Sequence, residues 1–90
     1  MTCYLYATKN KKSGDFGKIS TELYNKEQIK DLYINSVKEM PKDRQTLMQE
    51  LELYAVGSID TKTGIVTPKV EFLLDLGSVA YEQGTSETKA

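Results

Sequence analysis

The chain holds few of the side chains that carry chemistry in proteins. It has 90 residues, no histidine and a single cysteine, Cys3. The lack of histidine removes the commonest general base near neutral pH and the nucleophile arrangements built on it. With only one thiol, a zinc or copper site also lacks ligands. Carboxylate neighbours such as Glu50 and Glu52 are more typical of a solvated face. We therefore expect a protein that is not an enzyme and that has no cofactor or metal.

Aromatic and basic side chains form the most suggestive combination in the sequence. Single-stranded nucleic acid needs rings on which bases stack, at about 1 to 3 kcal/mol each, and ammonium groups that meet phosphates. The candidate nucleic-acid-binding residues are Tyr4, Tyr6, Lys9, Lys11, Lys12, Phe16, Lys18 and Tyr54. The alternative is structural, because tyrosines are also common in strands and at subunit contacts and a lysine-rich loop can be a solvated turn.

Composition favours a folded domain with a modest charge. Hydrophobic residues make up 39% and charged residues 28% of the chain, values typical of a globular protein. The formal net charge is −1, which argues against a broad electrostatic grip on nucleic acid. The apolar runs are too short to cross a bilayer, and the amino-terminal residues lack a secretory signal. We therefore expect a cytosolic protein with no membrane contact.

The amino-terminal residues predict a β-hairpin. Cys3 to Thr8 alternate small or aliphatic side chains with tyrosine and threonine, which is the period of a half-buried strand. The polar stretch that follows ends at Gly14 and suits a hairpin loop. A short second strand is expected from Phe16 to Ser20.

A helix is expected over residues 26–40. Asn25 and Gln28 have the spacing of a capping box, and Pro41 cannot continue a helix. One apolar stripe runs along the expected helix at three- and four-residue steps, formed by Ile29, Leu32, Tyr33, Val37 and Met40. Residues 42–49 are expected to be a connection, although Asp43 could cap a short helical turn that points Leu47 and Met48 inward.

A second hairpin follows. Residues 51–59 alternate in hydropathy as a long strand, residues 60–64 have turn chemistry and residues 65–67 return. Pro68 either ends this strand or opens a turn, and the apolar residues from Val70 to Leu76 fit a short helix or a final edge strand. Residues 82–90 contain no large apolar side chain and are expected to be a flexible tail.

The order of these elements predicts an α+β fold. We expect a small, mostly antiparallel sheet made from two β-hairpins in β-β-α-β-β order, with one amphipathic helix packed on one face. Residues 1–81 would form a single domain. Both faces of the first strand carry apolar side chains, so the face without a helix should be buried in a homodimer or offered to a partner.

One strand and turn of the second hairpin carry a family resemblance. Glu52-Leu53-Tyr54-Ala55-Val56-Gly57-Ser58-Ile59-Asp60, continued by Thr63-Gly64-Ile65-Val66, resembles the most recognisable segment of the small nonstructural proteins of gokushoviruses. These are single-stranded DNA bacteriophages of the microvirus group. The opening Tyr4-Leu5-Tyr6-Ala7, its Lys-Ser-Gly turn and the following helix are similar in order and spacing, so the resemblance covers roughly residues 3 to 70.

The resemblance implies a function in phage infection. It implies a non-enzymatic accessory protein in the cytoplasm of the infected bacterial host. The protein would act in the change from duplex replication to single-stranded DNA synthesis and genome packaging. Its partners would be viral replication or assembly proteins. The alternative is a protein that binds single-stranded DNA directly through the tyrosine and lysine surface.

Overall fold

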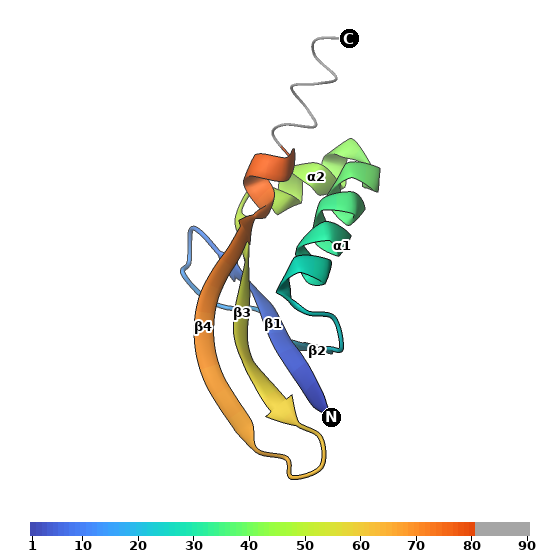
Figure 1. Ribbon diagram of the computed structural model, residues 1–90. Helices are drawn as coiled ribbons and strands as arrows, with labels where there is room; N and C mark the ends of the chain where they lie inside the picture. Colours follow the sequence, from blue (N-terminus) through green and yellow to red (C-terminus); the bar gives the residue numbers. More distant parts are fainter. Residues whose placement is uncertain (81–90) are drawn as a thin grey trace.

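A four-stranded antiparallel sheet forms the centre of the molecule (Figure 1). This computed structural model describes residues 1–80, so the expected tail at 82–90 lies outside the described residues. The strands are β1 (Thr2–Asn10), β2 (Ser20–Glu22), β3 (Leu51–Asp60) and β4 (Val66–Asp75), and they lie in the order β2-β1-β3-β4. The α+β class predicted from the sequence is confirmed.

Helix α1 (Lys26–Glu39) begins as its sequence predicts. The Asn25 side chain accepts a hydrogen bond from the backbone N–H of Gln28 at 2.9 Å, and the Gln28 side chain accepts one from the N–H of Asn25 at 3.0 Å. These two bonds satisfy amides that have no partner inside the helix. Ile29 and Val37 are the buried residues of α1. Their side chains fix the helix to one face of the sheet.

Two apolar clusters fill the space on this face. The first joins α1 to the centre of the sheet and consists of Tyr6, Ile29, Leu53 and Leu73. The second joins the end of α1 to helical residues 76–80 and consists of Val37, Leu76, Val79 and Ala80. Each fully buried aliphatic side chain contributes about 1.5 to 3 kcal/mol of transfer free energy. Both clusters therefore lie between the helices and one face of the sheet, and Ala7 is a buried residue outside them.

Residues 42–49 are not the expected connection, because Lys42–Met48 form a second helix, α2. Asp43 does not cap it. Pro41 stands at the N-cap with no side-chain hydrogen bond, and its carbonyl accepts from the amides of Arg44 and Gln45. The buried Gln45 side chain donates to the Val37 carbonyl at 3.0 Å and so ties α2 to α1. Leu47 does not point inward, since it is 68% exposed.

Strands β2 and β4 differ in extent from the sequence prediction. The expected strand at 16–20 is not continuous. Phe16 pairs with Lys9 of β1 through an isolated bridge, and β2 itself begins only at Ser20. β4 runs through Pro68 and continues to Asp75. This is possible because β4 lies at the edge of the sheet, where the missing N–H of proline need not have a partner.

The helical segments gather at one end of the molecule, and the β3–β4 turn lies at the other (Figure 1). The β3–β4 ladder shifts register at two places, and the hairpin curves along its length. Gly57 sits at one of these places with a φ of 154°, a conformation that L side chains rarely adopt. Among residues 1–80, no helix covers the face of the sheet that lies away from α1.

Candidate binding face

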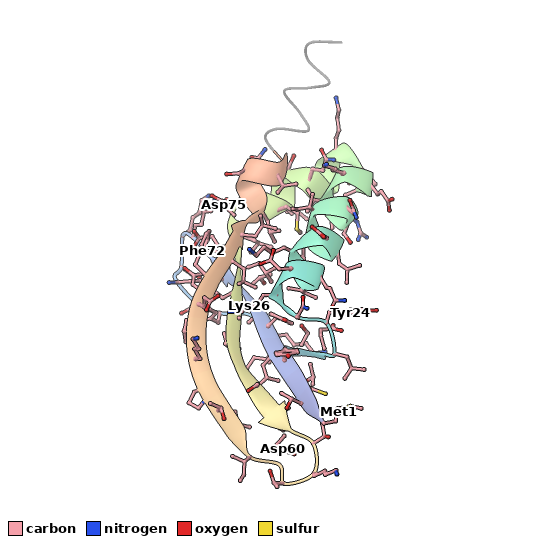
Figure 2. The ribbon with its side chains drawn as sticks, viewed as in Figure 1. Met1, Tyr24, Lys26, Asp60, Phe72 and Asp75 are labelled. Carbon is pink, nitrogen blue, oxygen red and sulfur yellow. The ribbon has the colours of Figure 1, made fainter. Side chains whose placement is uncertain are left out.

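The strand registers divide the sheet side chains between two faces. Directly paired residues point to the same side. Tyr6 pairs with Ala55, and both pack in the core under α1. Ala7 pairs with Tyr54, which in turn pairs with Phe72, so these three side chains point to the opposite side. Figure 2 shows Phe72 on the side of β4 away from α1.

We call the surface away from α1 the open face. Its members follow from register and from the alternation of each strand. They are Cys3, Leu5, Ala7 and Lys9 of β1, Glu52, Tyr54, Gly57 and Ile59 of β3, Val66, Pro68, Val70 and Phe72 of β4, and Phe16 from the β1–β2 connection. Most of these residues are apolar; Phe16, Val66, Val70 and Phe72 are exposed, whereas Ala7 is only 3% exposed.

An aromatic cluster lies on the open face. The Phe16 and Tyr54 ring centroids are 5.3 Å apart and the Tyr54 and Phe72 centroids 5.6 Å, both in edge-to-face geometry. Pairs of this kind contribute about 0.5 to 1.5 kcal/mol each beyond their burial. Phe16 remains 43% exposed and Phe72 51% exposed. The cluster is therefore ordered by its own contacts and still offers ring surface to another molecule.

Lys9 is the cation of this cluster. Its Nζ lies 5.5 Å from the Phe16 ring centroid and 5.6 Å from that of Tyr54, within the range of cation–π attraction. Glu52 pairs with Lys9 in the β1–β3 ladder and lies on the same face. The open face thus carries Lys9 and Glu52 beside its rings, and Asp75, the register partner of Glu52 in β4, lies on the same side.

Tyr4 and Tyr6 do not belong to this surface. Tyr6 is fully buried, and its hydroxyl donates to the Tyr24 carbonyl at 2.7 Å. Burial, followed by the neighbouring Tyr4 and Glu22, raises the pKa of the Tyr6 phenol. Tyr4 packs half-buried against the same core cluster. Both rings cover the sheet beneath α1, which corrects the expectation that they form a stacking surface.

The expected basic loop is largely neutralised by carboxylates. Lys11 Nζ lies 2.7 Å from an oxygen of Asp75 and also donates to the Gln49 carbonyl at 3.2 Å. Lys12 Nζ lies 2.7 Å from an oxygen of Glu50. Exposed pairs of this kind add at most about 1 kcal/mol to stability.

Lys18 is exposed between the Phe16 bridge and β2. Of the predicted site residues, the structure brings together Lys9, Phe16 and Tyr54.

Phe72 is the site residue that sequence reasoning missed. The signal for it was present, since Val66, Pro68, Val70 and Phe72 alternate with polar or charged residues up to Glu71. That alternation is typical of a half-buried strand. Pro68 hides this signal, because a proline can end a strand or open a turn and leaves a short helix or an edge strand equally open for Val70 to Leu76.

A groove of about 600 Å³ lies on the helix side, between α1 and the β1–β2 edge. Its lining is mainly apolar and includes Ile29, Leu32 and Met40, with Glu22, Tyr24 and Tyr33 as titratable groups. Burial and then the charge of Glu22 raise the pKa of the Tyr33 phenol. Tyr33 therefore stays protonated and neutral at physiological pH.

Within residues 1–80, no three His, Cys, Asp or Glu side chains are placed to hold a metal ion. None of the helices in that part of the chain combines the length and apolar character needed to cross a membrane. Comparisons with protein-family models, with curated proteins and with solved structures found no match.

Proposed function

We propose that the chain is a non-enzymatic binding protein that acts through contacts of the open face with another protein. One observation carries this proposal: an aromatic and aliphatic sheet face stands without a helix over it, with Phe72 51% and Val70 65% exposed. Contiguous apolar patches of this kind are uncommon on monomers and mark interaction sites. Aromatic residues are also enriched in protein interfaces.

The biological setting that we propose follows from the resemblance to gokushovirus nonstructural proteins. In that setting the chain is a phage accessory protein in the host cytoplasm. It assists the switch from duplex replication to single-stranded DNA synthesis and genome packaging, and it contacts replication or assembly proteins. An accessory protein of this kind needs a binding surface and no catalytic residue, which agrees with the open face.

The test is complementation of a phage that lacks its own copy of this gene. A plasmid copy with Phe72→Asp should fail to restore progeny yield and the normal ratio of single-stranded to duplex viral DNA. The matched control is Leu47→Asp, which places the same charge at an exposed apolar position on α2. A normal yield with Phe72→Asp would refute the role of the open face. A deletion that leaves both yield and ratio unchanged would refute the phage role.

The second candidate function is direct binding of single-stranded DNA. It is favoured by Lys9, whose ammonium group lies over two rings that could stack on bases. A labelled oligonucleotide should then bind at low salt and weaken steeply as salt rises, because phosphate contacts release counterions. Lys9→Ala should weaken this binding, whereas Lys62→Ala in the β3–β4 turn should not. The absence of binding at low salt would exclude this function.

A further inference from the structure

Two residues of β4, Pro68 and Lys69, disfavour the addition of a further strand at that edge of the sheet. In the β3–β4 turn, the Asp60 N–H donates to the Ile65 carbonyl at 3.0 Å. Because hydrogen-bonded and non-hydrogen-bonded pairs alternate along an antiparallel ladder, the Gly57–Pro68 pair is non-hydrogen-bonded. The ring nitrogen of Pro68 therefore faces outward and gives an added strand no donor. Lys69 stands next to it, and prolines and lysines are the residues that blunt sheet edges.

The open face is complementary to itself across its central strands. In each row of the β1–β3 ladder, a charged or large side chain of one strand stands beside an oppositely charged or small residue of the other. The rows are Lys9 with Glu52, Ala7 with Tyr54, Leu5 with Gly57, and Cys3 with Ile59. A two-fold axis that runs along the strands, between β1 and β3, places β1 of one copy over β3 of the other at the same height.

We propose that the partner of the open face is a second copy of this chain, packed face to face around that axis. Lys9 then meets Glu52 of the partner subunit and Leu5 lies over Gly57 of the partner subunit, while Tyr54 meets the ring surface of the facing sheet, because Ala7 is only 3% exposed within its own chain. The same rotation lays the Phe16 side of one sheet over the Phe72 side of the other. Two sheets of this kind stack about 10 Å apart and form a closed sandwich. This inference rests on the proposed function and names the partner of its site.

The size of the face fits a stable but exchangeable dimer. Three strands about 30 Å long and the short β2, spaced about 4.8 Å apart, give the sheet a flat area of roughly 500 Å². Two such faces bury roughly 1,000 Å² together, which is the lower limit for a specific interface. An isologous contact of this kind closes on itself, so association stops at two copies.

The row of Lys9 and Glu52 provides a test specific to this arrangement. Lys9→Glu gives a row with two acids, and Glu52→Lys gives a row with two bases. Wild-type protein should sediment as a monomer–dimer equilibrium, whereas each variant alone should associate at least about tenfold more weakly because like charges meet across the axis. An equimolar mixture of the two variants should form a heterodimer. The charge repulsion within each chain persists in the mixture, so recovery can come only from contact between chains.

Controls separate this proposal from loss of folding and from the proposed function. Lys62→Glu reverses a charge in the β3–β4 turn and should leave the wild-type equilibrium unchanged, and circular dichroism should show each variant folded. A monomeric wild-type protein at millimolar concentration, or a mixture that stays monomeric, would overturn the dimer. If Phe72→Asp still abolishes complementation when the wild type is monomeric, the open face binds a different protein and the proposed function stands. If it does not, both proposals fail.

Discussion

The hydroxyl of Tyr6 connects strand β1 to the start of α1. Tyr6 fills the core with its ring and donates to the Tyr24 carbonyl just before the N-cap Asn25. We predict that Tyr6→Phe keeps the packing but lowers the free energy of unfolding by about 0.5 to 1.5 kcal/mol, the net value of one hydrogen bond. Urea denaturation measures this change. Tyr54→Phe, which retains the ring contacts on the open face, is the control, and an equal loss in both variants would contradict the assignment.

Asp75 is the residue whose charge ties the loop after β1 to the end of β4. Burial alone would raise the pKa of its carboxyl, but hydrogen bonds from Lys11, Gly77 and Ser78 hold it below the ordinary value. Because the folded-state pKa is depressed, the stabilisation is present above the unfolded pKa of about 3.9 and is lost as pH falls through the folded pKa.

Asp75→Asn should therefore lower the free energy of unfolding near pH 7 and have almost no effect on it in acid. Urea unfolding of variant and wild type at about pH 7 and about pH 2.5 measures the two differences. The matched control is Glu50→Gln. It removes the carboxylate that pairs with Lys12 of the same loop, whereas the backbone N–H groups of Gly77 and Ser78 donate to Asp75. A destabilisation by Asp75→Asn that stays the same at both pH values would show that its charge contributes nothing.

At the scale of elements, the bend of the β3–β4 hairpin depends on one glycine. A Cβ added at Gly57 would lie 2.5 Å from the Thr67 carbonyl oxygen, and the φ of 154° is unfavourable for any L side chain. We predict that Gly57→Ala lowers the free energy of unfolding by about 1 to 3 kcal/mol. Gly17→Ala is the control, since its Cβ would meet neighbours only at 3.6 Å and its φ is not in the positive region. Equal midpoints for the two variants in urea would contradict this reasoning.

Local chemistry explains which elements the sequence predicts. The capping box at Asn25 acts within three residues and was found from spacing alone. Helix α2 has no side-chain cap and is held by the bond from Gln45 to Val37, a tertiary contact that no local pattern shows. β4 was predicted too short because the effect of Pro68 depends on whether its strand is central or at an edge, and only the assembled sheet decides that.

The same limit applies to the candidate site. Period-two alternation correctly separates Tyr4 and Tyr6 from Leu5 and Ala7. It does not show which face a helix will cover, and α1 covers the tyrosines. Tyr54 reaches the open face because its register partner is Ala7. Pairing register, which is set across the chain, therefore decides which rings meet another molecule.

For the molecule as a whole, the proposed dimer couples stability to concentration. A partner that binds only the folded state raises the unfolding temperature as protein concentration rises. We predict this rise for the wild type and its absence for Lys9→Glu in differential scanning calorimetry. The midpoint of the variant itself should lie lower, because Lys9→Glu also removes the contacts of Lys9 with two rings and places two acids side by side. Only the dependence on concentration is therefore compared. A wild-type midpoint that does not change with concentration would contradict the coupling.

The position of β1 between β2 and β3 also governs when the molecule can form. Thr2 pairs with Asp60 and Asn10 with Leu51, so the first strand to leave the ribosome finds its main neighbour only after both helices have been translated. At about 5 to 20 residues per second, this delay lasts several seconds. Leu5 and Tyr6 stay without their β3 partners during that time, so we expect folding yield to depend on translation speed across residues 11–50.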